Sequence, residues 1–539
     1  MVLVTRGEPN SIAARPLRTT GSTFGIATRL VNADLVLVDQ SGVPHPYLAE
    51  SIPQLNTDTW KVLPDGRMET TYKLRPNLTW HDGAPLSAKD FVFAWRVYTT
   101  QNLGIASLRP QSLMEEVAAP DDRTVVIRWR EIYLEADSLV GGSSGYQPLP
   151  EHILGGALAQ GDPDAFVAQP YWTTEYVGLG PYRLSRWEPG AFIETTAFPG
   201  HALGRPKIDR ARVIFVGDPN AALANMLAGS ANWAGDEALD FQRAVTLKQQ
   251  WDASNGGSVL LSPNELRYVQ VQFKTEYTNP AAILDSRVRK ALAHALDKQG
   301  LIDGILNGDG TYADTMIPNT LDYYPTVNSA IAKYPYDPRM TQQLMGEAGF
   351  TKDGDGWFAS PTGGRFNPEF RTQTGGQAEQ EMAIVVDGWR RAGVDARSFV
   401  LPAAQDQDLQ ARATFPSFAS ANSQLAEQTL LDKLVGSRAA RADNRWTGSN
   451  RGGYANSAYD RLVEGFSRQL DRGQRDQVMV QLMKLISDEL PIFPLYYNAR
   501  VVAFTGLSGP QGRSPGSTDY GNVYEWEFST AAPPTPARP

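Results

Sequence analysis

Residues 72–98, YKLRPNLTWHDGAPLSAKDFVFAWRVY, predict a strand, a tight turn and a helix in succession. The strand begins earlier, because the side chains from Met68 to Arg75 alternate with the period of a half-buried strand. Pro76 ends it, since proline has no backbone N–H for a strand ladder. Ser87 is suited to cap the helix that follows. The apolar face of that helix would consist of Phe91, Ala94, Trp95 and Tyr98.

The composition is typical of a soluble globular protein with more than one core. The length of 539 residues predicts roughly three to four units of ~150 residues. The net charge of −9, without a basic stripe, argues against a nucleic-acid partner. The chain has no cysteine, which excludes disulfides and thiol chemistry. No apolar run reaches the ~18 residues that a transmembrane helix needs.

Several stretches together resemble one known family, the extracellular solute-binding proteins of family 5, which serve ABC importers of peptides, nickel complexes or oligosaccharides. Residues 72–98 resemble the signature of that family. Further matching stretches lie at 42–51, 141–154, 178–190, 285–302 (DSRVRKALAHALDKQGLI) and 490–504. The resemblance therefore covers nearly the whole chain.

The resemblance implies an α/β fold of the periplasmic-binding-protein type, with two lobes of mixed sheets joined by two hinge crossings, in the large class that has an extra subdomain. The expected division is lobe I at 1–45, 178–265 and 505–539, the extra subdomain at 46–177, and lobe II at 266–504. Residues 285–299 predict one amphipathic helix. The tail at 530–539 holds four prolines in ten residues and is predicted to be disordered.

The resemblance also implies a function without catalysis. The protein would capture a peptide-like solute by hinge closure and deliver it, as a monomer, to an ABC permease in the membrane. Residues 1–7 do not read as a signal peptide. The implied location is therefore the periplasm or the cell surface as a lipoprotein, with the signal segment absent from this sequence. No cofactor is expected.

Two motifs suggest other chemistry. Gly141–Gly145 matches G-x-S-x-G, so a serine hydrolase using Ser143 is the alternative of another class, but no strong strand precedes it and prolines follow. Asp353–Gly356 (DGDG) resembles part of a calcium loop but lacks its other ligands, so we expect a hairpin turn. The five histidines are far apart in sequence, and no metal site is predicted.

The predicted ligand contacts combine aromatic faces with polar groups. Trp446 lies in a loop that reaches the ligand cleft in the family, and Arg451 in the same loop could hold a carboxylate. Trp233 follows a helix that ends at Gly229. The full set of predicted ligand-binding residues is Tyr146, Trp233, Phe415, Phe418, Asn422, Trp446, Arg451 and Tyr454.

One stretch departs from the family pattern. Peptide-binding members have an aromatic residue followed by an aspartate that pairs with the amino terminus of the ligand, but residues 409–426 here contain no acid. An ammonium without a partner is costly to bury. Neutral groups such as Asn422 instead suit a neutral oligosaccharide or a modified peptide. A peptide-like solute remains the first hypothesis, and a neutral ligand is the alternative.

Overall fold

The computed structural model describes residues 1–15, 17, 25–100, 103, 110–139, 145–374, 376–402, 405, 408–512 and 517–529. Ser143 and the tail at 530–539 lie outside these residues. The chain divides into two compact units, Met1–Ser262 with Arg500–Pro539, and Pro263–Ala499. No helix of the described residues is long and apolar enough to cross a membrane.

Unit 1, Met1–Ser262 with Arg500–Pro539, contains a mixed sheet with the strand order β11-β1-β10-β9-β8 and a separate antiparallel sheet with the order β4-β5-β7-β6. The first sheet consists of β1 (Val2–Thr5), β8 (Tyr182–Glu188), β9 (Phe192–Ala197), β10 (Arg210–Phe215) and β11 (Trp233–Ala234). The second consists of β4 (Trp60–Val62), β5 (Met68–Lys73), β6 (Met114–Asp121) and β7 (Thr124–Trp129). The helices are α1 (Gly25–Val31), α2 (Ala88–Thr99), α3 (Glu151–Ala159), α4 (Pro163–Val167), α5 (Pro219–Leu227) and α6 (Phe241–Ser254). Two short two-stranded sheets, β2 (Val36–Val38) with β3 (Pro44–Pro46) and β20 (Leu507–Ser508) with β21 (Glu527–Phe528), complete the unit.

The stretch at 72–98 folds as a strand, a turn and a helix, as predicted, although Trp95 of the predicted apolar face is only partly buried. Strand β5 ends at Lys73, and Ser87 caps α2 by accepting a hydrogen bond from Lys89 N at 3.3 Å. Asp90 completes a capping box, because its carboxylate accepts from Ser87 N at 2.9 Å. The buried face of α2 includes Phe91 and Tyr98. These caps explain why the helix begins immediately after the turn.

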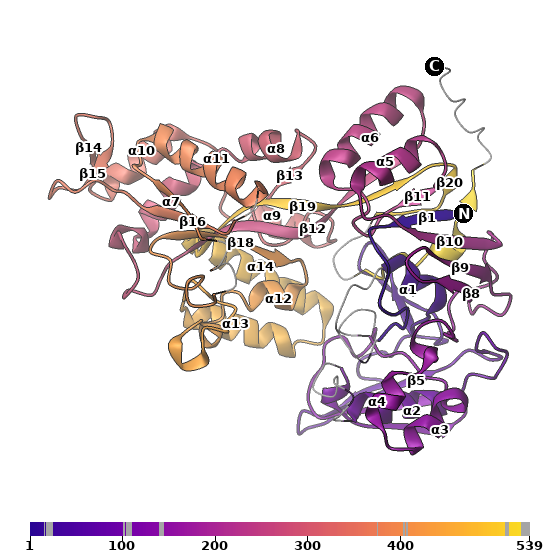
Figure 1. The fold of residues 1–539 in the computed structure, drawn as a ribbon. Coiled ribbons are helices and arrows are strands. Elements are labelled where there is room, and N and C mark those ends of the chain that lie inside the picture. The colour runs from indigo at the N-terminus through magenta and orange to yellow at the C-terminus, as the bar shows by residue number, and fades with distance from the viewer. Residues whose placement is uncertain are drawn as a thin grey trace. The chain divides into compact units, whose positions relative to one another are not determined.

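Unit 2 is built on a sheet with the strand order β17-β16-β18-β12-β19, and β13 pairs with β19 at its side. Its strands are β12 (Ser258–Val271), β13 (Thr311–Tyr312), β16 (Glu369–Thr372), β17 (Arg397–Val400), β18 (Phe418–Gln424) and β19 (Ile492–Phe504). Its helices are α7 (Ser286–His294), α8 (Lys298–Leu306), α9 (Tyr324–Ala330), α10 (Pro338–Glu347), α11 (Gly376–Ala392), α12 (Glu427–Leu431), α13 (Ser457–Arg468) and α14 (Arg472–Glu489). In Figure 1, α7, α10 and α11 lie on one side of this sheet and α12, α13 and α14 on the other.

The predicted single helix at 285–299 is wrong, because the structure has two helices there. Helix α7 ends at His294, and α8 begins at Lys298. The side chain of Asp297 accepts a hydrogen bond from Gly300 N at 2.9 Å and so caps a new helix. Ala295 and Leu296 are nevertheless buried, so the apolar face continues across the break.

The chain passes from one unit to the other twice, each time within a strand. The first boundary, Ser262/Pro263, lies inside β12, and the second, Ala499/Arg500, lies inside β19. These two strands are neighbours in the sheet order. The subdivision of unit 1 into a lobe and an extra subdomain stays a prediction.

The DGDG turn is confirmed. Asp353 accepts hydrogen bonds from Asp355 N at 2.9 Å and Trp357 N at 3.0 Å. The turn closes the hairpin of β14 (Thr351–Lys352) and β15 (Phe358–Ala359).

Candidate ligand-binding site

Three strands of unit 2 bring polar side chains together around Glu265. Its carboxylate accepts hydrogen bonds from Asn422 Nδ2 at 2.9 Å and from Asn498 Nδ2 at 3.2 Å. The antiparallel register of β12 and β18 places Arg267 opposite Asn422, and strand neighbours of this kind share one face of the sheet. The Glu265 side chain remains 19% exposed. A carboxylate therefore lies beside the stretch 409–426, which has none of its own.

A buried ion pair lies beside the polar group around Glu265. Arg267 Nε lies 3.0 Å from Glu381 Oε2 on α11, and the Tyr496 hydroxyl donates to the same oxygen at 2.9 Å. Burial acts to lower the pKa of Arg267, but the charge of Glu381 and its hydrogen bond outweigh burial and raise it. Gln377 links the pair to the strand edge by donating to the Tyr496 hydroxyl at 3.0 Å. The pair fixes the orientation of β12 against α11.

Tyr268, the next residue along β12, is buried on the opposite face of the strand. Burial is the main cause that raises the pKa of Tyr268 to about 12, and the charge of Glu265 adds to it. Arg451 and Arg267 act in the opposite direction. Both Glu265 and Arg451 therefore act on one hydroxyl group, which has no hydrogen-bond partner among the described residues. The charges of Glu265 and Arg451 thus shift the pKa of this buried hydroxyl in opposite directions.

Arg451 belongs to a cluster of cations that we call the cationic cluster: Arg412, Lys433 and Arg451. All three side chains are half-buried. Burial is the largest cause that lowers the pKa of Arg451, and the positive charge of Arg412 lowers it further. Burial, then the charges of Arg451 and Arg412, lower the pKa of Lys433, while the charge of Asp432 acts in the opposite direction. Three like charges thus gather where solvent screens them only in part.

A further cation, Lys274, lies near two aromatic rings. Lys274 Nζ is 5.4 Å from the ring centre of Trp446 and 5.4 Å from that of Tyr277, within the range of a cation–π contact. It also donates to the carbonyl groups of Ala413 at 2.6 Å and Ala440 at 3.2 Å. Burial lowers the pKa of Lys274 to about 8. Lys274 therefore holds the three segments around Ala413, Ala440 and Trp446 together.

Five of the eight predicted ligand contacts are buried core residues in this structure, and their stacking role stays a prediction. Trp233 packs edge-on against Tyr520 at 5.2 Å, and Phe418 packs against Trp389 at 4.9 Å. Each of these rings already has core neighbours on its faces, which leaves no open face for a ligand. The five residues, with 0–3% exposure, are Tyr146, Trp233, Phe415, Phe418 and Tyr454.

The other three predicted residues, Asn422, Trp446 and Arg451, keep part of their surface exposed. Glu265, which bonds Asn422, is not among the residues predicted from the sequence. A signal was present, because Glu265 and Arg267 are charged and lie two positions apart, hence on one face of a strand that is otherwise apolar or neutral. The sequence could not show that this strand pairs with 418–424.

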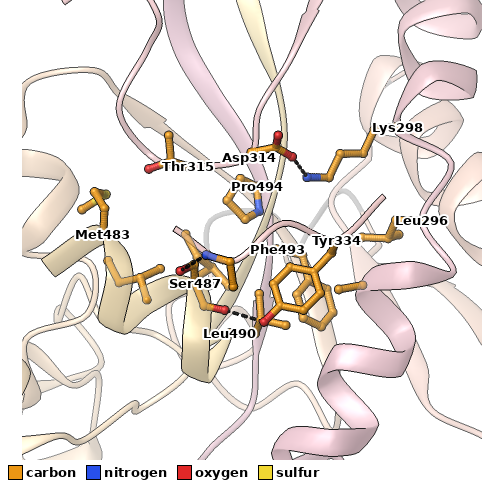
Figure 2. A pocket seen from close by; sticks show the side chains of 14 residues that line it. Leu296, Lys298, Asp314, Thr315, Tyr334, Met483, Ser487, Leu490, Phe493 and Pro494 are labelled. Carbon is orange, nitrogen blue, oxygen red and sulfur yellow. Dashed lines mark hydrogen bonds and ion pairs between the residues drawn. The ribbon is translucent and has the colours of Figure 1, made fainter. Parts of the chain in front are cut away.

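One cavity of unit 2 is too small to hold a peptide. Figure 2 shows Lys298 paired with Asp314 at 2.9 Å, and the Tyr334 hydroxyl donating to the Ser487 carbonyl at 2.7 Å, at its wall. Its free volume of about 20 Å³ is room for about one water molecule. Among the residues that the structure describes, no three His, Cys, Asp or Glu side chains are placed to hold a metal ion.

Comparisons with known proteins confirm the resemblance. The family described as "Bacterial extracellular solute-binding proteins, family 5 Middle" matches residues 46–427. The oligopeptide-binding protein AppA of Bacillus subtilis (strain 168) is 24% identical over 456 residues, 84% of this chain and 77% of that protein.

Solved structures show the same fold. The structure of AppA from Bacillus subtilis in complex with a nonapeptide has a TM-score of 0.63 and 21% identity, and the match covers 98% of this chain and 99% of that one. HbpA2 from Haemophilus parasuis has a TM-score of 0.78 and 19% identity over 98% of this chain and 99% of its own. The predicted α/β solute-binding fold is confirmed. The chain belongs to the bacterial extracellular solute-binding proteins of family 5.

Proposed function

We propose that this protein captures a peptide-like solute outside the cytoplasmic membrane and delivers it to an ABC importer. Members of its family are extracellular solute-binding proteins. A relative that matches 84% of this chain is an oligopeptide-binding protein, and a structure of it holds a nonapeptide. These two facts favour a peptide over an oligosaccharide.

The observation that carries the proposal is the carboxylate of Glu265 beside the Asn422 amide. A peptide has a free ammonium group, and an ammonium entering a partly dry site needs a negative partner. Glu265 supplies that charge, and the Asn422 carboxamide supplies a neutral hydrogen-bonding group on the same face of the sheet. The ligand ammonium would bind against Glu265 and displace part of the hydrogen bonding between Glu265 and Asn422.

Closure of the two units on the solute would be absorbed where the chain crosses between them. In β19, Asn498 is held within unit 2 by Gln377 at 2.7 Å and Glu265 at 3.2 Å. Two residues later, Arg500 is held within unit 1 by Asp236 at 2.7 Å. Ala499 lies between two anchored side chains, so its backbone dihedral angles are the natural place for a hinge.

The protein would act by binding alone, as a monomer, with no chemical change to its solute and no nucleic-acid partner. Its place of action would be the periplasm or the cell surface. The ligand contacts would be Glu265, Asn422, Trp446 and Arg451, a smaller and more polar set than the aromatic platform expected from the sequence.

Isothermal titration calorimetry with three probe sets tests this function: mixed di- to pentapeptides with free termini, the same peptides N-acetylated, and linear malto-oligosaccharides. We expect binding of the free peptides and clearly weaker binding of the acetylated ones, because acetylation removes the ammonium that Glu265 would hold. Binding of sugars alone would overturn the proposal and favour the neutral-ligand alternative.

A further inference from the structure

The two strands that cross between the units are joined by a side-chain hydrogen bond close to both boundaries. Glu265 is the third residue of unit 2 on β12, and Asn498 is its last but one on β19. Asn498 Nδ2 donates to Glu265 Oε1 at 3.2 Å, and we call this hydrogen bond the crossing clamp. Val271 N on β12 donates to the Pro491 carbonyl, just before β19, at 3.2 Å. The two strands therefore run antiparallel, with Glu265 facing Asn498 across them.

The backbone of β12 lacks one donor at the boundary between the units. Pro263, its first residue in unit 2, has no N–H and cannot donate to a strand ladder. The side chains at 259–265 are partly exposed, whereas those at 266–271 are buried. The crossing clamp therefore lies at the less protected end of the strand, where a side-chain bond contributes more to holding β12 against β19.

The carboxylate of the crossing clamp is the one that we assign to the solute ammonium. Its Oε2 accepts from Asn422 Nδ2 at 2.9 Å, while its Oε1 accepts from Asn498. Nη1 of Arg267 lies 3.9 Å from Oε1, beyond hydrogen-bonding distance. A hydrogen bond to a carboxylate owes about half of its strength to the charge. An ammonium that compensates the charge of Glu265 therefore weakens the bond from Asn498.

Asn498 has a second anchor, which comes from α11. Its Oδ1 accepts from Gln377 Nε2 at 2.7 Å. Gln377 also donates to the Tyr496 hydroxyl at 3.0 Å, so this anchor is itself held in place. When Asn498 no longer donates to Glu265, it keeps one anchor instead of two, directly beside the proposed hinge residue Ala499.

We propose that Glu265 couples solute binding to the hinge: the solute ammonium competes with Asn498 for the Glu265 carboxylate and so releases the crossing clamp beside Ala499. The inference deepens the proposed function and rests on it for the identity of the solute. Such coupling is reciprocal, because the factor by which the clamp lowers solute affinity is the factor by which the solute weakens the clamp. Asn498 is thus a positioning residue that needs no contact with the solute.

The first experiment measures the hinge without any peptide, and so does not depend on the solute. Amide hydrogen exchange of residues 497–501 is compared in wild type, Asn498→Leu and Glu265→Met. Each variant removes the crossing clamp, so we expect faster exchange in this segment than in wild type. Exchange in α13 reports on the fold of unit 2 as a whole and should not change.

Asn422→Leu is the matched control, because it removes the other hydrogen bond of the same carboxylate and leaves the crossing clamp intact. Its segment 497–501 should exchange no faster than that of wild type. Equal exchange at 497–501 in wild type and both clamp variants would overturn the inference, and so would equally fast exchange in Asn422→Leu.

The second experiment measures the affinity for free-amine and N-acetylated di- to pentapeptides by calorimetry. Asn498→Leu should bind the free-amine peptides about fivefold more tightly than wild type, at the low end of coupling between linked sites, because Asn498 no longer competes for the carboxylate. N-acetylated peptides should bind both proteins alike. In a Glu265→Gln background the Asn498 substitution should leave the affinity unchanged, since the charge that couples the two residues is absent.

The two experiments separate the inference from the proposed function. Unchanged or weaker binding of free-amine peptides by Asn498→Leu would overturn the coupling while peptide binding stands. If no peptide binds although Asn498→Leu exchanges faster at 497–501, the proposed function is overturned, and with it release by a solute, while the crossing clamp itself stands.

Discussion

The carboxylate of Glu265 accepts a hydrogen bond of 2.9 Å from Asn422 across the paired strands β12 and β18, although the two residues are 157 positions apart. Asn422 belongs to a stretch without an acidic residue, and from the sequence alone that stretch favoured a neutral ligand. The fold places the carboxylate of Glu265, from the neighbouring strand, beside this stretch. The absence of an acid in one segment is therefore no argument against binding an ammonium.

Replacing Glu265 by glutamine should weaken the binding of free-amine peptides about ten- to hundredfold. The substitution keeps the shape and the hydrogen bond from Asn422 but removes the charge, and a hydrogen bond to a charged group contributes about 1.5–3 kcal/mol. N-acetylated peptides should bind the variant and the wild type equally. Calorimetric titration of both peptide forms measures the difference.

Glu464→Gln, an exposed change on α13, is the control for a general effect of charge. Its affinities should match those of wild type. If Glu265→Gln retains wild-type affinity for free-amine peptides, the ammonium binds elsewhere and the role given to Glu265 is wrong.

Local sequence rules predicted the elements whose ends are set by nearby residues. The strand ending at Lys73 and the helix capped by Ser87 follow from alternation, a proline and a capping residue within thirty positions of each other. The break between α7 and α8 was missed because the apolar period continues through Ala295 and Leu296, while the cap at Asp297 decides the boundary.

The site was predicted only in part, because it depends on pairing between distant strands. Trp233 and Phe418 have the residue type of a ligand platform, yet each faces its own core, and periodicity cannot tell the two faces of a strand apart without knowing what covers them. Arg451 and Asn422 were found as polar residues in loops or at strand edges. Glu265, which bonds Asn422, comes from a strand whose pairing with β18 the sequence does not show.

The buried pair of Glu381 and Arg267 should be necessary for the stability of unit 2. Glu381→Met leaves the buried Arg267 guanidinium with only Glu265, at 3.9 Å, as a counter-charge, and removing a close partner of a buried charge typically costs about 3–5 kcal/mol. The double variant Glu381→Met/Arg267→Met should recover most of this loss, since a well-packed apolar pair of similar volume is often close to neutral. Urea-induced unfolding of the single and double variants measures the coupling.

The exposed pair of Asp387 and Arg391 on the same helix is the control, with 2.6 Å between its charged atoms. Asp387→Asn should change the free energy of unfolding by less than about 1 kcal/mol. Equal losses for the buried and the exposed pair would mean that burial does not govern the Glu381 effect.

Lys274 should make stability rise with pH in the alkaline range. Burial lowers its pKa to about 8 in the folded protein, while a lysine in the unfolded chain titrates at about 10.4. Between these values the unfolded chain binds more protons, so the free energy of unfolding increases as the pH rises through this window. The increase should be about 1 kcal/mol, because the half-exposed ammonium is partly screened by solvent.

The contribution of Lys274 is isolated by comparison with Lys274→Met, which cannot titrate. The difference in unfolding free energy between wild type and variant, measured at pH 7 and at pH 10, should shift in favour of wild type at the higher pH. A difference that stays constant between the two pH values would show that the Lys274 ammonium titrates normally.

The two residues of the α2 capping box have different roles. Ser87 acts at the helix end, whereas the buried Asp90 also connects the helix to other elements. Ser87→Ala removes one acceptor at the helix end and should cost about 1 kcal/mol of stability. Asp90→Ala should cost more, about 2–4 kcal/mol, because the buried Asp90 carboxylate also accepts from Glu151 N at 3.2 Å and from Trp80 Nε1 at 3.4 Å. Urea titration of both variants ranks the two effects. Equal losses would mean that Asp90 acts only at the helix end, and that its bonds to the α3 terminus and to Trp80 contribute nothing measurable to unit 1.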